Sequence, residues 1–320
     1  MATVSARIGE IRPVAAIRQR MDRREWGILL FLALIWGGAF FCIKIAVTHV
    51  EPLTYVWLRL SIAALALWLF LRWRGERLGL PLPIWGAIFF LALLNTMVPF
   101  ALFGWGQQRI ASGLASILNA TTPIWGVLVA HAWTRDERIT PAKLTGVLVA
   151  FAGVAAMIGP ELLLGGDGVL PQLACLAAAL CYAIAGVWAR RFKGLGVSPL
   201  KVAAGQMIVG ALAMTPVALV IDQPWLDAWP PLEAWAAIAA VALFATALGY
   251  VLYFRLIDSA GATNALLSTL LVPPTALLLG ALFLDERLSL GQFGGLAFIA
   301  AGLALIDGRL VNRFRRRVVA

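Results

Sequence analysis

Polar side chains recur at helical spacing within the long apolar segments of this 320-residue sequence. One such face, with spacings of four, three and four residues, comprises Ser112, Ser116, Asn119 and Pro123. Its hydroxyl and amide groups can bind a small polar molecule, and they can equally hydrogen-bond a neighbouring helix. With aromatic and charged groups included, the candidate binding set is Trp36, Lys44, Arg59, Asn95, Asn119, Thr246, Tyr250, Asn264 and Ser268.

Two members of this set are cations in apolar surroundings. Arg59 lies well inside its apolar segment, and Lys44 lies close to the end of another. Charged groups are costly in hydrocarbon, so they should face the interior of a helix bundle. There they would suit a carboxylate ligand, although a snorkelling side chain or a structural ion pair would have the same sequence signal. No Asp or Glu lies deep in any apolar segment, which disfavours an exchange of protons for organic cations.

The composition indicates that the surrounding solvent is lipid. Hydrophobic residues make up 62% of the chain and charged residues 13%, whereas soluble domains carry roughly a quarter of charged residues. The net charge of +10 would also suit a nucleic-acid-binding protein. However, the basic residues lie between apolar segments and at both termini, which is typical of a multi-spanning membrane protein. Nucleic acid is therefore not an expected partner.

Ten apolar segments are each long enough to cross a bilayer as a helix. We expect membrane spans near residues 26–47, 53–71, 84–103, 110–133, 141–159, 168–190, 199–221, 233–254, 262–284 and 291–307. These segments are too long, and too apolar on all sides, to be strands of a barrel. The predicted fold class is therefore an all-α membrane protein with ten transmembrane helices.

The distribution of positive charge predicts the orientation. With the N-terminus in the cytoplasm, all but four of the 26 Lys and Arg residues fall on the cytoplasmic side, the exceptions being Lys44, Arg59, Arg109 and Arg287. Residues 1–25 then form a cytosolic basic arm, and residues 308–320 a basic cytosolic tail. The expected location is the inner cell membrane, with both termini cytoplasmic.

One short phrase occurs twice in the sequence. At a constant spacing of 149 residues, the matching sets are Asp136, Glu137, Arg138, Gly146, Ala152, Gly153 and Asp285, Glu286, Arg287, Gly295, Ala301, Gly302. This match divides the chain into two five-helix repeats, residues 26–160 and 168–307. Because each repeat has an odd number of spans, the repeats must enter the membrane in opposite senses. Inverted repeats of this kind are typical of carriers that open alternately to either side.

The repeated phrase also carries helix-start signals. Thr140 and Ser289 are predicted N-caps of the helices that follow, and Gln292 is positioned to complete a capping box with Ser289. For Glu137 and Glu286 we consider two roles: a structural one in the hairpin, and one in substrate binding or gating.

Several segments resemble the EamA-type branch of the drug/metabolite transporter superfamily. They are "WGGAFFCIK" (36–44), "PLTYVWLRL" (52–60), "TPIWGVLVAHAWTRDERITPAKLTGVLVAFAGV" (122–154) and "LVPPTALLLGALFLDERLSLGQFGGLAFIAAGLAL" (271–305). The resemblance covers residues 26–307. It implies a central cavity lined chiefly by the first, third, fourth, sixth, eighth and ninth spans. It also implies transport of amino acids and other small metabolites, often outward.

The resulting expectation is a secondary transporter, most simply an amino-acid or metabolite exporter that works by alternating access. Its partners would be the lipid bilayer and a small-molecule substrate, with no cofactor and no metal. The alternatives are a multidrug/proton antiporter of the same superfamily and a non-transporting membrane scaffold. An enzyme is not favoured, because His49 and His131, the two histidines of the sequence, are expected on opposite sides of the bilayer.

Overall fold

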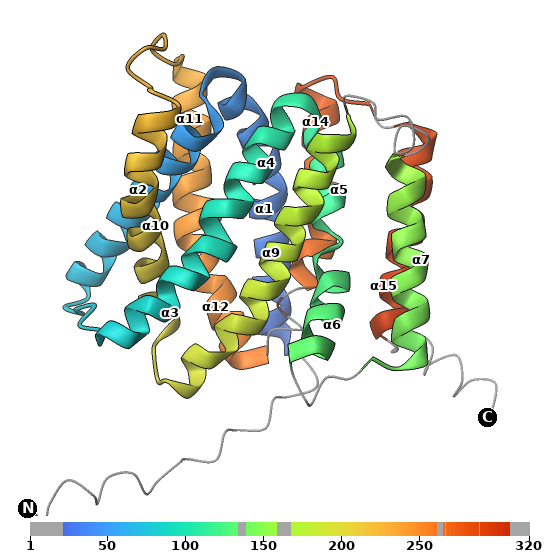
Figure 1. Ribbon diagram of the computed structural model, residues 1–320, viewed down its shortest axis with the longest axis horizontal. Helices are drawn as coiled ribbons and strands as arrows, with labels where there is room; N and C mark the ends of the chain where they lie inside the picture. The colour runs from blue at the N-terminus through green and yellow to red at the C-terminus, as the bar shows by residue number, and fades with distance from the viewer. Residues whose placement is uncertain are drawn as a thin grey trace, which may run out of the picture.

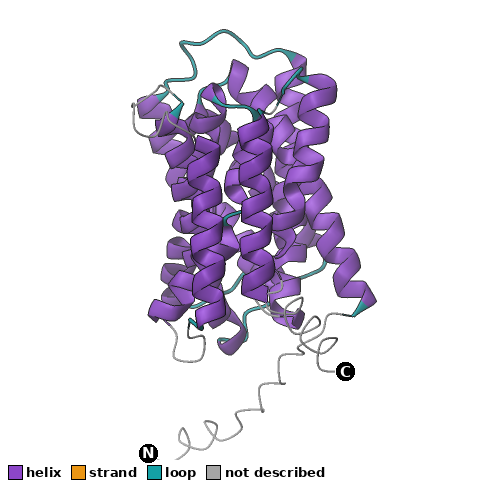
Figure 2. Cartoon of the chain, turned by 90° about the vertical axis from the view of Figure 1, so that its right-hand side faces the viewer, coloured by secondary structure: helices purple, strands orange, loops and turns teal. Residues whose placement is uncertain are grey.

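The computed structural model describes residues 22–133, 139–158, 168–260, 265, 267–287 and 289–307. Over these residues the chain is helical and has no strand (Figures 1 and 2). Most of the helices stand side by side with their axes close to a common direction (Figure 2). The expected all-α class is confirmed for the described part of the chain.

The helices divide between the first and second parts of the sequence. The first part contains α1 (Arg23–His49), α2 (Pro52–Trp73), α3 (Leu82–Ala92), the π-helix η1 (Leu93–Met97), α4 (Val98–Arg109), α5 (Ser112–Asn119), α6 (Thr122–Trp133) and α7 (Pro141–Ile158). The second part contains α9 (Val169–Gly194), α10 (Pro199–Ile221), α11 (Leu232–Ala240), the π-helix η2 (Val241–Leu248), α12 (Gly249–Ala260), the 3₁₀-helix η3 (Leu267–Leu271), α14 (Val272–Phe283) and α15 (Leu290–Asp307).

Seven of the described helical runs are long and apolar enough to cross a membrane. They are Arg23–His49, Pro52–Trp73, Leu82–Arg109, Ser112–Trp133, Val169–Gly194, Pro199–Ile221 and Leu232–Ala260. Three further apolar helices are shorter, namely Lys143–Ala156, Val272–Phe283 and Leu290–Leu305. The seven long runs coincide with the predicted spans one to four and six to eight. The chain is therefore a helical multi-span membrane protein.

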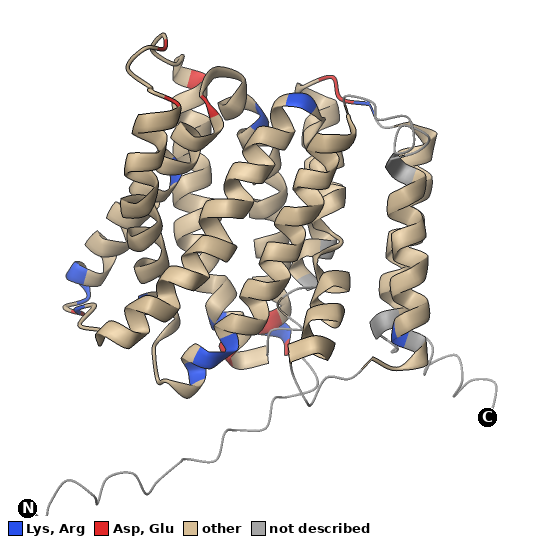
Figure 3. Ribbon diagram, viewed as in Figure 1, with Lys and Arg blue, Asp and Glu red and all other residues tan. Residues whose placement is uncertain are grey.

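Charge and apolar surface are separated along the bundle. Nearly all the Lys, Arg, Asp and Glu residues drawn in colour lie towards its two ends (Figure 3). Between the ends, large apolar side chains such as Leu34, Leu65 and Leu148 are exposed, as expected for a surface that faces hydrocarbon. We call the end where α1 joins α2 and α14 joins α15 the upper end, as it is drawn in Figure 1, and the opposite end the lower end.

α7 and α15 pack chiefly against each other at one side of the bundle (Figure 1). A Cβ atom added to Gly153 would lie 2.8 Å from the carbonyl oxygen of Gly295, and one added to Gly302 would collide with the carbonyl oxygen of Gly146. Only glycine allows backbones to approach so closely. Because the contacts pair the late part of each helix with the early part of the other, the two helices are antiparallel. They therefore begin at opposite ends of the bundle.

The predicted caps of these two helices are confirmed. The Thr140 hydroxyl oxygen accepts from the backbone N–H of Lys143 at 3.3 Å. At α15, the Ser289 N–H donates to Oε1 of Gln292 at 2.9 Å, and the Gln292 N–H donates to Oγ of Ser289 at 3.2 Å. The second pair is the reciprocal capping box that the sequence indicates.

The buried apolar side chains form two cores. One joins α1, α2, α10 and α12, and includes Leu32 and Leu60. The other joins α5, α9, α14 and the α7–α15 pair, and includes Ile117. Trp36 and Tyr182 pack against both cores, so they mark the boundary between them.

Candidate functional site

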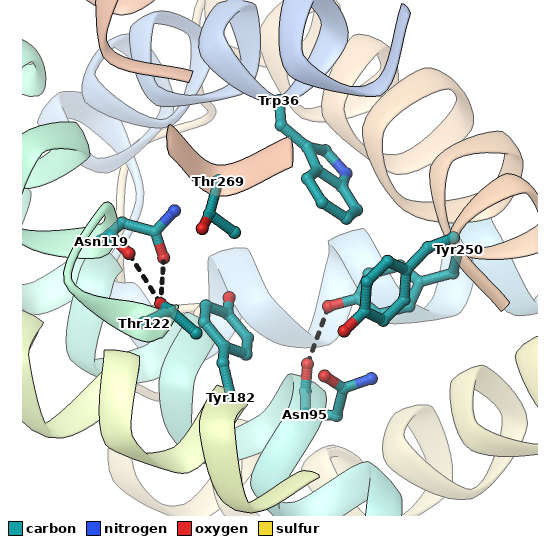
Figure 4. Close-up of a pocket in the computed structure, with 8 residues that line it drawn as sticks. Trp36, Asn95, Asn119, Thr122, Tyr182, Tyr250 and Thr269 are labelled. Carbon is teal, nitrogen blue, oxygen red and sulfur yellow. Dashed lines mark hydrogen bonds between the residues drawn. The ribbon is translucent and has the colours of Figure 1, made fainter. Parts of the chain in front are cut away.

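A cavity lies at this boundary between the two cores. Its walls come from α1, η1, α5, α6, α9, α12 and η3, which belong to the six spans implied by the family resemblance (Figure 4). The lining residues are Trp36, Asn95, Asn119, Thr122, Tyr182, Tyr250, Tyr253 and Thr269.

The first polar group of the wall arises from a proline in the third span. Pro99 has no N–H to offer the carbonyl four residues before it, which is that of Asn95. The chain at this point forms the π-helix η1. The Tyr250 hydroxyl donates to the freed Asn95 carbonyl at 2.8 Å (Figure 4). The side-chain Nδ2 of Asn95 donates to Oε1 of Gln206 at 3.2 Å, so the residue is held from two sides.

A second proline interrupts the fourth span. α5 ends at Asn119 and α6 begins at Thr122, so Pro123 does not continue the helical face of Ser112, Ser116 and Asn119. That expectation was wrong because Pro123 cannot donate to the Asn119 carbonyl, and the helix breaks there. The Thr122 hydroxyl donates to this carbonyl instead, at 2.6 Å (Figure 4). The break therefore turns both residues towards the cavity.

Aromatic rings form another wall of the cavity. The ring of Trp36 lies 5.4 Å from that of Tyr253 and 6.2 Å from that of Tyr250, measured between centroids. Nε1 of Trp36 donates to the carbonyl oxygen of Ala245, within the π-helix η2, at 2.9 Å. A Cβ atom on Gly249 would lie 2.9 Å from this Nε1, so the indole can lie here only beside a glycine. The indole is thereby fixed in orientation.

Arg59 and Thr246 lie behind this wall rather than in it. Arg59 is 5% exposed, and its Nε donates to the Thr246 hydroxyl at 2.7 Å. Its Nη1 donates to the Tyr55 hydroxyl at 3.1 Å, and its guanidinium carbon lies 3.4 Å from the centre of the Phe100 ring. Both predicted residues thus belong to a buried network next to the cavity.

Lys44 lies away from the cavity, towards the upper end. Its ammonium donates to the carbonyl oxygens of Gln107 at 2.6 Å and of Ile110 at 3.1 Å. These are carbonyls at the end of α4, where a positive charge also complements the helix dipole. Lys44 therefore caps a helix rather than lining the cavity.

Glu286 reaches the same place from the α14–α15 link. Its Oε1 accepts from the Ser112 N–H at 2.7 Å, while its Oε2 accepts from the Ser112 hydroxyl at 2.8 Å and from the Gly113 N–H at 3.1 Å. A carboxylate at a helix start satisfies free N–H groups and complements the dipole. We call Lys44, Glu286 and the α4–α5 residues that they bind the elbow clamp.

The remaining candidates are placed as follows. Ser268 is buried, and its hydroxyl donates to the carbonyl oxygen of Ala265 at 2.6 Å. Asn264 lies outside the described residues. Sequence reasoning omitted Thr122, Tyr182, Tyr253 and Thr269 from the binding set, although all four line the cavity. The first and last of these had a usable signal, since each lies close before a proline that breaks a span, whereas Tyr182 has no polar partner at helical spacing.

The cavity offers groups that can bind a small molecule. Its lining residues are all uncharged, and they offer hydroxyl groups, amides and aromatic faces. Within the part of the chain that the structure describes, no three His, Cys, Asp or Glu residues are grouped so that they could hold a metal ion. The arrangement can therefore hydrogen-bond the polar ends of a small solute and stack on its apolar part.

Similar proteins are named as transporters. YoaV, an uncharacterized transporter of Bacillus subtilis (strain 168), is 24% identical over 86% of this chain and 94% of YoaV. An uncharacterized transporter of Archaeoglobus fulgidus is 25% identical over 88% of this chain and 98% of that protein. YedA, an uncharacterized inner membrane transporter of Escherichia coli (strain K12), is 26% identical over 88% of this chain and 90% of YedA.

The fold and the sequence profile agree with these relatives. A protein with a known crystal structure superimposes with a TM-score of 0.65 over 88% of this chain and 96% of that one, at 20% identity, which indicates a shared fold. The profile of the EamA-like transporter family matches residues 25–159 and again residues 170–307. These two matches include most of the sequence, and the chain therefore belongs to the EamA-like transporter family.

Proposed function

We propose that this protein is a secondary transporter that exports small organic solutes, such as amino acids or similar metabolites, by alternating access across an inner cell membrane. The observation that carries the proposal is the cavity lined by polar and aromatic groups at the level where helices of both chain halves are interrupted. Interrupted helices with free backbone groups are characteristic of binding sites in secondary carriers. The family membership supports the same conclusion.

The proposed transporter consists of ten spans in two inverted five-helix repeats, residues 26–160 and 168–307. The antiparallel contact of α7 with α15 supports this, since each would be the last helix of its repeat. Two lysines give further support. Lys44 of α1 binds the last carbonyls of α4 at the upper end, and Lys193 of α9 binds the carbonyl oxygen of Asp258, near the end of α12, at 2.8 Å. The same contact thus recurs in opposite orientation.

The elbow clamp provides a closed gate at the upper end in this mechanism. Ser112 belongs to the first repeat and Glu286 to the second, so their hydrogen bonds join the repeats. A cavity between the repeats can open upward only when these bonds break. With both termini in the cytoplasm, the upper end is the outer one, and the clamp closes the exit.

Counterflow in proteoliposomes tests the transport proposal. Liposomes containing the purified chain are loaded with unlabelled solute, and the uptake of the same labelled solute is measured for amino acids and small carboxylates, with and without a pH gradient. We expect saturable counterflow for at least one solute, and its loss in Asn119→Leu, which replaces a polar wall group. Leu148→Ala, on the lipid-facing surface, is the matched control. If no solute moves in any pairing, the transport proposal is contradicted.

Cysteine labelling tests the inverted repeats and the orientation. In a chain whose native cysteines Cys42, Cys175 and Cys181 have been replaced, single cysteines are introduced as Thr140→Cys and Ser289→Cys. We expect an impermeant maleimide to label the first from the cytoplasm alone and the second from the outside alone. Labelling of both from one compartment would contradict the proposed topology.

Glu286→Gln tests the elbow clamp as a gate. Because hydrogen bonds to a charged group contribute about 1.5–3 kcal/mol, loss of the charge should raise the population of the outward-open state by about tenfold. The measurement is the outside labelling rate of a cavity cysteine, Thr269→Cys, in the cysteine-free chain. Glu233→Gln, which alters an upper-end carboxylate paired with His49, should leave that rate unchanged. Equal rates in the Glu286 and Glu233 variants would refute the gate.

A further inference from the structure

Arg59 is a buried cation, and no residue that the structure describes gives it an anionic partner. Among the described residues its polar contacts are the hydroxyls of Thr246 and Tyr55, and its guanidinium lies over the Phe100 ring. These groups are neutral, and a guanidinium stays protonated in proteins. The protein therefore maintains a full positive charge in its interior, although such a charge is costly there.

This charge lies one layer of side chains behind the cavity. The Phe100 ring, which the guanidinium covers, lies 6.3 Å from the ring of Tyr250, a residue of the cavity wall. Thr246, which accepts from Arg59, lies one helical turn before Tyr250.

No lining residue neutralises this charge, because all eight are uncharged. Arg59 therefore contributes a positive electrostatic potential inside the cavity. For two unit charges roughly 8 Å apart at an effective dielectric constant of about 20, Coulomb's law corresponds to a change in affinity of about 30-fold. We expect an effect of this order, with tighter binding of a unit anion and weaker binding of a unit cation than of a neutral analogue.

We propose that the cavity selects solutes that carry a carboxylate, because Arg59 supplies the unmatched positive charge. The inference rests on the proposed transport function and names the substrate class of the same cavity. The amide of Asn119 lies on the wall and can donate to the carboxylate. The rings of Trp36 and Tyr253 contact the apolar part of the solute. In a zwitterion, the ammonium group can make a cation–π contact with the same rings. Organic cations without a carboxylate are excluded.

A charge series on one scaffold tests the proposal. The probes are 3-phenylpropionate, phenylalanine, 3-phenylpropanamide and 2-phenylethylamine, with propionate, alanine, propanamide and ethylamine as a smaller series. Binding to the purified full chain is measured by thermal stabilisation, and transport by counterflow in proteoliposomes. In at least one series, we expect the acid to bind about 30-fold more tightly than the amide, the zwitterion to bind, and the amine to bind most weakly.

Variants at Arg59 separate the effect of its charge from its packing. Arg59→Met should lower the affinity for the acid about 30-fold, to that of the amide, while leaving the affinity for the amide unchanged. Arg59→Lys keeps the charge and should keep the preference for the acid. Arg109→Met, which removes an exposed arginine at the end of α4, should change neither affinity. A purely structural Arg59 would lower the affinities for acid and amide together, or leave their ratio intact.

The outcomes for the inference and for the proposed function are distinguishable. If the amines bind or move as well as the acids, the inference is overturned while the transporter assignment stands. If no solute moves in counterflow, the proposed function fails. If acids and zwitterions of both series neither bind nor move, the inference fails irrespective of what else the cavity accepts. If Arg59→Met does not fold, the affinities of the wild-type protein for the acid, amide and amine probes still decide between these cases.

Discussion

Of the helical runs that line the cavity, α1 and α9 are continuous but the others are interrupted, whereas α7 and α15, which pack together at the side of the bundle, each run without a break. Pro99, Pro123 and Pro273 accompany the interruptions at η1, between α5 and α6, and at η3. α7 has its only proline, Pro141, at its first residue, where no hydrogen bond is lost, and α15 has none.

The difference shows that proline and glycine have opposite structural effects within one bundle. Proline releases backbone carbonyls, and the side chains of Tyr250 and Thr122 bind those of Asn95 and Asn119 around the cavity. Glycine does the opposite at α7 and α15, where it removes side chains so that the two backbones touch. Polar groups are thus exposed around the cavity, and close backbone contact is made where the two chain halves pack together.

The largest expected effect is at the glycine contact. Gly153→Ala would place a methyl group 2.7 Å from Cβ of Phe298 and 2.8 Å from the backbone oxygen of Gly295. We expect this overpacking to destabilise the protein by about 3 kcal/mol, measured by thermal unfolding in detergent. Gly294→Ala is the control, because a Cβ there meets nothing within 4 Å. Equal stability of the two variants would show that the close approach is not required.

A smaller effect is expected at the carbonyl that Pro99 releases. Tyr250→Phe leaves the buried Asn95 carbonyl without the hydroxyl that donates to it, at a cost of about 2 kcal/mol. In a Pro99→Ala background the new backbone N–H of residue 99 can donate to the Asn95 carbonyl. Tyr250→Phe should therefore destabilise that background by about 1 kcal/mol less than it destabilises the wild type. Stability is measured for both single variants and the double variant. If the stability changes of the two single variants simply add in the double variant, the Tyr250 hydroxyl contact does not depend on Pro99.

The smallest expected effect concerns the break between α5 and α6. Thr122→Val removes the hydroxyl that donates to Asn119 and should cost about 1 kcal/mol in stability. Thr122→Ser retains the hydroxyl and should restore most of that loss. Solute affinity, measured by counterflow, should follow the same order. A serine variant as weak as the valine variant would assign the effect to the missing methyl group.

The long spans and the helix caps could be predicted from the sequence because both have strong local signals. A long apolar run is rare in soluble proteins and therefore indicates a membrane span. The capping box at Ser289 and Gln292 depends on residues only three positions apart. Trp36, Asn95, Asn119 and Tyr250 also reach the cavity as expected, since large polar or amphipathic groups in apolar spans tend to face the interior.

Lys44, Arg59 and Thr246 do not line the cavity, for a common reason: the sequence indicates that a side chain is buried but not which residues surround it. Lys44 finds carbonyls at the end of α4, and Arg59 finds Thr246 of η2, so their partners are remote in the sequence. Tyr182 was missed for the converse reason, because its neighbours in the cavity all come from other helices. The position of a helix break can be read from the local sequence, because a proline marks it. The group that donates to the freed carbonyl depends on tertiary packing.

The glycine contact between α7 and α15 also bears on how such a chain can originate. Gly153 meets Gly295, and Gly302 meets Gly146, so each chain half offers the surface that the other half requires. In the proposed inverted-repeat arrangement, a polypeptide with one half alone would leave this surface uncovered, and a second copy in the opposite orientation would be needed to cover it. Fusion of the two proposed repeats into one polypeptide would supply both in equal number and would let each diverge while the contact is kept.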